Sequence, residues 1–216
     1  DRHDDLRKLY LQYAEALAAT KHTYEFIFVL DGIDHGAFKT VQTLKSEFPE
    51  IEVITLNRWV GEATVLAIGF DLAQGAIILT LTPYLQVEPS EIHRVLKELS
   101  EDNKDLVISW RYPRIDSVFN RIQSWGFHGL TRMLTGMRYH DISCGLRAMK
   151  REVVEEVQLY GDLHRFFPLL TYQRGFKVVE LPVQQSQTDT KRRVYHPGVY
   201  LRRLLDLLTV SFLLKF

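Results

Sequence analysis

The chain has 216 residues, the size of one large domain, and its charges balance, with 27 Lys and Arg against 27 Asp and Glu. Apolar residues make up 46% and charged residues 25%, which is typical of a globular protein and excludes a disordered, collagen-like or disulfide-stapled chain. The zero net charge argues against binding nucleic acid by bulk electrostatic attraction. The single cysteine, Cys144, excludes an internal disulfide and a zinc site built on cysteines, and predicts a reducing compartment.

Neither end of the chain reads as a membrane span. The first residues are charged, unlike a signal peptide, and no apolar run reaches the ~18 residues of a span. The nearest candidate, residues 204–216, is too short and contains Asp206. We expect a chain that does not cross a membrane, while contact of its C-terminal end with one stays open.

Helical periodicity and short apolar runs alternate in the first half of the chain. The periodic segments predict helices over residues 6–17, 37–48, 61–72 and 89–100, the last beginning at Pro89. The apolar runs predict strands over residues 24–30, 51–56, 76–81 and 106–110. This alternation predicts an α/β protein whose parallel sheet is covered by helices on both faces.

The pattern changes after residue 115. A long helix is predicted over residues 117–134, and shorter helices over 151–157 and 166–174. A strand is predicted over residues 177–183, and the polar segment 184–193 is predicted to be mobile.

Ligands of such sheets bind at the carboxyl ends of the strands, which here are followed by segments 31–32, 57–61, 82–86 and 111–114. Asp31 beside Gly32 is of the type that binds nucleotide hydroxyls or a base, but it equally fits a turn, and the local residues favour the turn. Neither the GxGxxG nor the GxxxxGK[ST] pattern is present, which excludes those two phosphate-binding fingerprints.

Three histidines have charged neighbours in the sequence. Asp34-His35 lacks the partners of a metal site and reads as a solvated loop. His140-Asp141 reads either as an orienting pair or as a helix cap. His164-Arg165 is suited to binding a phosphate or orienting a carboxylate, the alternative being an ordinary surface helix start.

Two longer stretches carry a family resemblance. Residues 139–149 read YHDISCGLRAM and residues 159–168 read LYGDLHRFFP. With residues 174–178, 180–183 and 204–210, these resemble family 2 glycosyltransferases. Within that family the chain is similar to the polyprenyl-phosphate sugar transferases, the subgroup of dolichyl-phosphate mannose synthase. The likeness covers nearly the whole chain, with several motifs in the right order.

The resemblance implies a GT-A fold, a Rossmann-like three-layer α/β/α arrangement with a mostly parallel central sheet. The family opens with one more strand, so we expect this chain to lack that strand and to be a fragment of a longer protein. It further implies a single glycosyltransferase-like domain over residues 1–216, with a C-terminal amphipathic helix over residues 197–216.

The resemblance places nucleotide binding at five positions: Asp31, Gly32, Asn57, Gly61 and Gln86. The chain departs from the family at three others. Leu30 replaces the first of two aspartates, and Glu62 stands where Lys or Arg is usual. The Asp-x-Asp motif that follows the third strand reads Thr82-Pro83-Tyr84.

The third departure concerns the metal. Sugar transfer from a nucleotide builds negative charge on the leaving diphosphate, and in the family a Mg²⁺ or Mn²⁺ ion held by Asp-x-Asp stabilises it. Thr82 and Tyr84 are neutral, which leaves Gln86 as a possible ligand and predicts weak or absent metal binding. One hypothesis is that Lys191 or Arg193, in the family's flexible basic loop, replaces the ion.

The acceptor implied by the resemblance is a lipid phosphate, already ionised at neutral pH, which needs cations rather than a general base. The candidate acceptor and phosphate-binding residues are Arg111, Arg121, Ser124, His164, Arg165, Lys191 and Arg193. For Arg121, a solvated helix face is an equally good interpretation.

The C-terminal segment is basic and has an apolar stripe, predicted to comprise Tyr200, Leu204, Leu207, Leu208 and Phe212. A basic amphipathic helix is typical of a membrane interface, whereas the alternative is a helix packed on the domain. The resemblance favours the membrane, and places the protein in the cytoplasm, peripheral at the cytoplasmic face of a membrane.

The sequence thus predicts a transferase that moves a sugar from a UDP- or GDP-linked donor to a polyprenyl phosphate or a glycan. The competing hypothesis is a catalytically impaired relative that acts as a binding or scaffolding partner, because the donor site departs from the family. The expected partners are the nucleotide sugar, the lipid phosphate, a membrane surface and a homo- or hetero-oligomer, and no nucleic acid.

Overall fold

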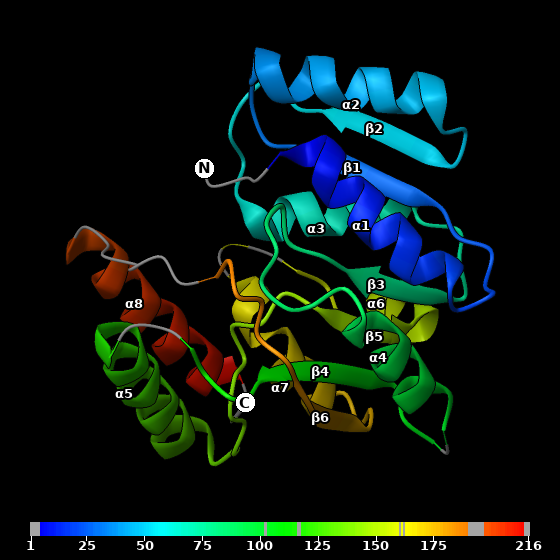
Figure 1. Ribbon diagram of the computed structural model, residues 1–216. Helices are drawn as coiled ribbons and strands as arrows, with labels where there is room; N and C mark the ends of the chain where they lie inside the picture. The colour runs from blue at the N-terminus through cyan, green and yellow to red at the C-terminus, as the bar shows by residue number, and fades with distance from the viewer. Residues whose placement is uncertain are drawn as a thin grey trace.

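The computed structural model describes residues 5–101, 103–115, 118–159, 161, 163–189 and 197–213 (Figure 1). Its strands are β1 (Phe26–Leu30), β2 (Ile51–Thr55), β3 (Ile77–Thr80), β4 (Leu106–Arg111), β5 (Arg147–Lys150) and β6 (Val178–Val183). The helices are α1 (Leu6–Ala18), α2 (His35–Glu47), α3 (Glu62–Leu72), α4 (Glu91–Ser100), α5 (Val118–Thr135), α6 (Arg151–Glu156), the 3₁₀ turn η1 (Leu163–Phe166), α7 (Phe167–Gln173) and α8 (Pro197–Leu213). Every strand and helix predicted from the sequence is present, with ends shifted by a residue or two.

The strands form two sheets rather than one. β1 and β2 pair in parallel, and the second sheet has the order β3-β5-β4-β6. In that sheet β5 runs opposite to the other three strands, because it is antiparallel to both β3 and β4 while β4 and β6 are parallel. The sheet is therefore mostly parallel, as expected, with one reversed strand that the sequence pattern did not identify as a strand.

Helices cover both faces of the sheets and bury two main clusters of apolar side chains. On one face, α1, α2 and α4 pack on the strands, and on the other face lie α3, α6, η1 and α7. Helix α1 places Leu9, Tyr13 and Leu17 in a cluster with residues of both sheets, including Phe28 and Leu79. The Glu25 carboxylate before β1 also accepts hydrogen bonds from the backbone N–H groups of Gln74 and Gly75 before β3.

The mostly parallel sheet that the sequence predicts is present, and its hydrogen bonding divides it into a two-stranded and a four-stranded part. Within the part of the chain that the structure describes, β1 pairs only with β2, and β3 pairs only with β5. The helix α1 and the Glu25 contacts hold the two sheets together, since no strand of the described residues joins β1 to β3.

Two local predictions were wrong. Pro89 lies in a turn before α4, whose first residue is Glu91. The described part of the segment predicted to be mobile, residues 184–189, is built into the protein: Gln185 bridges to Val87, and Gln185, Ser186 and Asp189 are buried. Their side chains and backbone hydrogen-bond within the domain, which a count of polar residues could not reveal.

Helices α5 and α8 lie side by side at one flank of the four-stranded sheet (Figure 1). The Ser211 hydroxyl on α8 donates to the backbone carbonyl of Leu134 on α5, and Leu207 and Val210 pack into the core. Within the described residues, every helix is too short or too polar to span a bilayer.

Candidate active site

The first strand-end loop is fixed by Asp31. Its two carboxylate oxygens accept the backbone N–H groups of Val60 (2.7 Å) and Gly61 (2.9 Å), tying the loop after β1 to the loop after β2. Gly61 has φ +93°, a conformation that favours glycine, and it directly precedes α3. The Asp31 carboxylate therefore holds the neighbouring loop.

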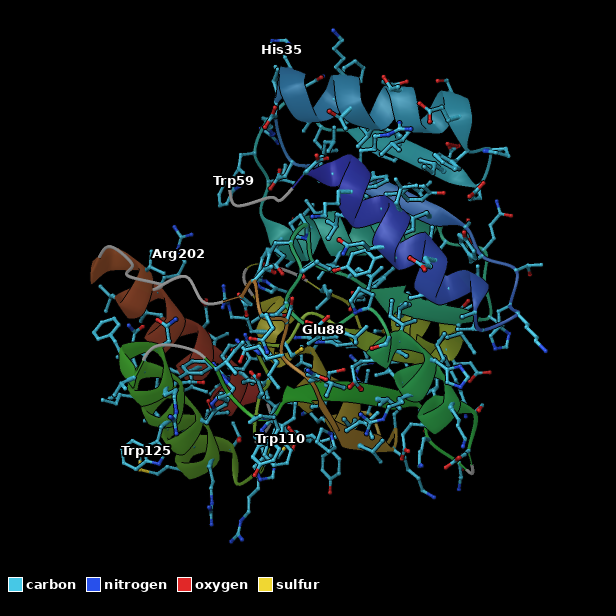
Figure 2. All side chains as sticks on the ribbon, in the orientation of Figure 1. His35, Trp59, Glu88, Trp110, Trp125 and Arg202 are labelled. Atoms are coloured by element: carbon cyan, nitrogen blue, oxygen red, sulfur yellow. The ribbon has the colours of Figure 1, made fainter. Side chains whose placement is uncertain are left out.

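The rest of that second loop faces solvent. Asn57 is exposed, and Trp59 stands on the outside of the molecule (Figure 2). Gly32 is buried against this loop, where an added Cβ would meet the Trp59 backbone nitrogen at 3.5 Å. The structure thus brings Asp31, Gly32 and Gly61 together and leaves Asn57 at the rim.

The loop after β3 closes on itself. The Thr82 hydroxyl donates to the carbonyl of Tyr84 (2.6 Å), and the buried Gln86 side chain accepts the backbone N–H of Gly145 (2.7 Å). A Cβ on Gly145 would lie 2.2 Å from the Thr82 methyl group, so only glycine fits there. Gln86 is used to join this loop to residues 144–146, and its amide oxygen already has a partner.

The residues at the Asp-x-Asp position do not fit a divalent cation. Thr82 and Tyr84 are neutral, and the Thr82 hydroxyl is engaged with a carbonyl. Among the residues that the structure describes, no group of three or more His, Cys, Asp and Glu side chains is arranged to hold a metal ion. We therefore assign no step of the chemistry to a metal.

A carboxylate and an imidazole meet at the start of α3. Glu62 Oε2 lies 3.1 Å from His164 Nε2, although the His164 side chain comes from η1, far along the chain. His164 is only 5% exposed and its Nδ1 has no hydrogen-bond partner among the described residues, whereas the Glu62 side chain is 60% exposed. The pair thus joins a buried ring to a carboxylate at the surface.

The charges around Glu62 keep it ionised. Burial acts to raise the pKa of Glu62, but the hydrogen bond and charge of His164, with the charges of Arg165 and Arg147, outweigh it and lower the pKa to about 2. Arg147 is buried and donates to the carbonyls of Ile142, Cys144 and His164. It therefore fixes η1 against the loop before β5 and so positions the His164 ring.

The second charged cluster surrounds Arg111, at the end of β4. Arg111 is 1% exposed; it donates to both carboxylate oxygens of Asp141 (2.6 and 3.1 Å) and to Asp189 (3.3 Å), and Arg114 reaches Asp141 as well. Burial would raise the pKa of Asp141, but the charge and hydrogen bonds of Arg111 lower it to about 2. The guanidinium of Arg111 is thus enclosed by protein carboxylates, which does not support the prediction that it holds an acceptor phosphate.

The other predicted acceptor residues are spread along the surface. Arg121 is exposed on α5, as the solvated-face interpretation expected. Ser124 pairs with His128 one turn on (3.3 Å), and burial lowers the pKa of His128. Arg165 is half-buried near Glu62. Lys191 and Arg193 lie outside the described residues.

Several residues of these clusters were missed from the sequence. Asp189 and Arg114 gave no motif signal, and Arg147 lay within the quoted stretch YHDISCGLRAM without a role. His140-Asp141 is neither a helix cap nor a simple pair: Asp141 binds Arg111, while His140 pairs with Glu180 (2.8 Å) and stacks on Trp110. Asp34 caps α2 and His35 is the exposed first residue of that helix, so the two residues begin a helix instead of standing in a solvated loop.

The loops after β1, β2 and β3 lie at the carboxyl ends of strands, where sheets of this type bind ligands, and comparison with known proteins identifies the family. Residues 5–158 match the family described as Glycosyl transferase family 2. The chain belongs to this family. The match covers well over half of the chain and includes the strand-end loops after β1, β2 and β3.

Curated relatives resemble the chain along nearly all of its length. It is 29% identical over 207 residues to a dodecaprenyl-phosphate galacturonate synthase of Rhizobium johnstonii, covering 94% of this chain and 61% of that protein. It is 30% identical over 211 residues to an undecaprenyl-phosphate 4-deoxy-4-formamido-L-arabinose transferase of Photorhabdus laumondii, covering 96% and 65%. The chain therefore spans less than two thirds of the length of these relatives.

Solved structures confirm the GT-A fold. The mannosyltransferase PcManGT of Pyrobaculum calidifontis, in complex with GDP-Man and Mn²⁺, superposes with a TM-score of 0.64 at 15% identity, over 98% of this chain and 61% of that one. The glucosyl-3-phosphoglycerate synthase of Mycobacterium tuberculosis, solved with Mn²⁺ and UDP-glucose, gives a TM-score of 0.53 at 14% identity, over 92% and 84%.

Proposed function

We propose that the chain transfers a sugar from a nucleotide-sugar donor to a polyprenyl phosphate at a membrane surface. The family membership and the two polyprenyl-phosphate transferases among its relatives support the reaction class. The strand-end loops after β1 and β2, held by Asp31, supply the donor side. Because the chain covers only part of those relatives, the whole activity stays a proposal.

The observation that carries the lipid acceptor is an exposed apolar surface on α5 and α8, which we call the α5–α8 face. It comprises Val118, Phe119, Ile122, Trp125, Met133, Leu201, Leu204, Leu205, Leu208 and Phe212. Trp125 is 80% exposed (Figure 2). Many large apolar side chains exposed on two neighbouring helices mark a site for a partner or a membrane.

The charges beside this face favour an anionic membrane. Arg121 and Arg132 on α5 and Arg202 on α8 are exposed, and α5 contains no acidic residue. Basic side chains next to an apolar helix face are attracted to the anionic lipids of a cytoplasmic leaflet. We therefore propose peripheral binding at that leaflet, with both helices in contact.

The stripe predicted for α8 needs one correction. Leu207 is buried in the core, whereas Leu204, Leu208 and Phe212 are exposed on another side of the helix. The side chain of Tyr200 lies outside the described residues. The helix therefore packs on the domain with one side and exposes apolar side chains on another, and the second side is the one that we propose meets the membrane.

In the proposed reaction an ionised phosphate oxygen of the lipid attacks the anomeric carbon of the donor sugar. The bond between that carbon and the nucleotide diphosphate breaks, and the diphosphate leaves with the electron pair. No proton needs to be removed from the acceptor, so a general base is not required. The protein must align the acceptor oxygen with the breaking bond and stabilise the leaving charge. Arg165, half-buried and close enough for its charge to lower the pKa of Glu62, is a cation on this side of the site.

The first experiment is calorimetric titration with UDP and GDP, each with and without Mn²⁺. We expect binding of one nucleotide, little changed by Mn²⁺, because Thr82 and Tyr84 do not fit the ion. The second step supplies UDP- and GDP-sugars with undecaprenyl phosphate in vesicles and measures the lipid-linked sugar. Nucleotide binding without any transfer would favour the scaffolding alternative, and failure to bind either nucleotide would contradict the donor site altogether.

Vesicle binding tests the membrane part separately. Vesicles of phosphatidylcholine mixed with anionic phosphatidylglycerol should co-sediment the chain, and Trp125→Ser should weaken that binding. Trp59→Ser is the matched control, because Trp59 is also exposed but lies on the loop after β2. Equal loss in both variants, or no binding by the unmodified chain, would contradict the role of the α5–α8 face.

A further inference from the structure

The pair of Glu62 and His164 has no task in the acceptor chemistry. A lipid phosphate is already ionised, so Glu62 and His164 are not needed to remove a proton from the acceptor. The pair is nevertheless held in place by the rest of the structure. Arg147 donates a hydrogen bond to the backbone carbonyl of His164, and the buried His164 ring points its Nε2 at Glu62 Oε2. A half-exposed carboxylate supported in this way is suited to contacting a ligand.

The position of Glu62 places that ligand in the donor site. It is the first residue of α3 and directly follows Gly61, whose N–H is held by Asp31. The loop carrying Gly61 is one of the strand-end loops where sheets of this type bind ligands. Glu62 therefore lies beside the proposed nucleotide-sugar site and faces solvent there.

Glu62 also has hydrogen-bonding capacity to spare. A carboxylate accepts at both oxygens, and His164 occupies Oε2. Among the described residues, His164 is the side chain that pairs with the Glu62 carboxylate, and the Glu62 side chain is 60% exposed, so a donor group of a ligand can reach it. Hydroxyl and amino groups of a sugar would complete it, whereas a second carboxylate would be repelled.

We propose that Glu62, positioned by His164, selects the donor sugar: it accepts hydrogen bonds from hydroxyl or amino groups and excludes donors whose sugar carries a carboxylate. This inference rests on the proposed function and narrows its substrate class to neutral or amino sugars. It separates this chain from its relative that is named a galacturonate synthase, whose sugar is a uronate.

The test compares nucleotide sugars that differ only in a carboxylate: UDP-glucose with UDP-glucuronate, UDP-galactose with UDP-galacturonate, and GDP-mannose with GDP-mannuronate. The affinity ratio within each pair cancels the effect of the shared nucleotide diphosphate. In the pair whose nucleotide binds, we expect the uronate to bind ~10-fold more weakly, as one nearby like charge would produce.

Variants at position 62 then test whether the charge of Glu62 causes the preference for the neutral sugar. Glu62→Gln keeps the shape and removes the charge, so the ratio should fall to about one. Glu62→Lys reverses the charge and should invert the ratio in favour of the uronate. Glu15→Gln on α1 is the matched control, since it removes one exposed carboxylate in the last turns of a helix that starts at Leu6 and should leave the ratio unchanged.

Equal affinity for both members of a pair in the unmodified chain would overturn the inference while leaving the proposed function intact. A preference for neutral sugars that Glu62→Gln and Glu62→Lys leave unchanged would overturn it as well. Failure to bind UDP, GDP or any of the six nucleotide sugars would instead contradict the proposed function, and the inference with it.

Discussion

Two charged clusters lie at strand ends in this protein, and they differ in how their charges are used. Around Arg111 the guanidinium and the carboxylates of Asp141 and Asp189 are buried and satisfy one another. At Glu62 the imidazole of His164 is buried, but the Glu62 side chain is 60% exposed to solvent. Removing one partner of a buried charge pair is costly because it leaves an unpaired charge inside the protein, whereas a half-exposed charge remains able to bind a ligand.

The largest effect should come from breaking the Arg111 cluster. Asp141→Asn removes the bidentate partner of a buried guanidinium, and we expect a loss of about 3–5 kcal/mol in the free energy of unfolding. Urea denaturation measures it. Asp71→Asn, at an exposed position of α3, is the control and should cost less than about 0.5 kcal/mol. An equal change in the free energy of unfolding in both variants would show that the ion pair of Arg111 with Asp141 does not contribute to stability.

Two adjacent leucines on α8 give the next largest effect. Leu207→Ala should lower the free energy of unfolding by about 2–5 kcal/mol, because the side chain is fully buried in the core. Leu208→Ala should change it by less than about 0.5 kcal/mol and weaken vesicle binding instead, since Leu208 belongs to the α5–α8 face. If both variants lost stability alike, the α5–α8 face would be core rather than a docking surface.

A smaller effect tests the contact between the loop after β3 and residues 144–146. Gly145→Ala should cost about 1–3 kcal/mol, because the new methyl group would overlap the Thr82 methyl group at 2.2 Å. Thr82→Ser removes that methyl group and keeps the hydroxyl bond to Tyr84. The double variant should therefore regain most of the loss, and a double-mutant cycle that gives strict additivity would contradict the contact.

The smallest effect is a dependence on pH. Asp141 has its pKa lowered from 3.8 to about 2 in the folded chain, so the unfolded chain binds more protons in that range. The stability that Asp141 contributes is present above about pH 4 and is lost as the pH falls towards 2. The free energy of unfolding, measured across this pH range, should fall less steeply with falling pH in Asp141→Asn than in the unmodified chain. An equally steep fall in both would contradict the prediction.

The sequence was a good guide to the elements and a poor guide to the partners of their charged residues. Alternating apolar runs and helical periods placed the predicted strands and helices within a residue or two, because local burial patterns set them. The reversed strand β5 was not identified as a strand, since direction depends on pairing with β3 and β4 rather than on its own four residues.

For the site, residue type could not distinguish Arg111 from His164. Both are predicted to bind phosphate, and the folded chain adds that Arg111 is buried and paired with Asp141 and Asp189. The departure at Glu62 was visible in the sequence, whereas its partner His164 lies about a hundred residues away and only the folded chain brings them together. The local residues favoured a turn at Asp31, whereas its carboxylate bonds the loop after β2, about thirty residues along the chain.

One crossed measurement tests the difference between the two clusters most directly. Asp141→Asn and Glu62→Gln would each be measured for free energy of unfolding and for the affinity ratio between a neutral nucleotide sugar and its uronate. The account predicts that Asp141→Asn lowers stability and keeps the ratio, whereas Glu62→Gln keeps stability within about 0.5 kcal/mol and abolishes the ratio. A Glu62→Gln variant that loses stability as Asp141→Asn does, with its ratio unchanged, would contradict it.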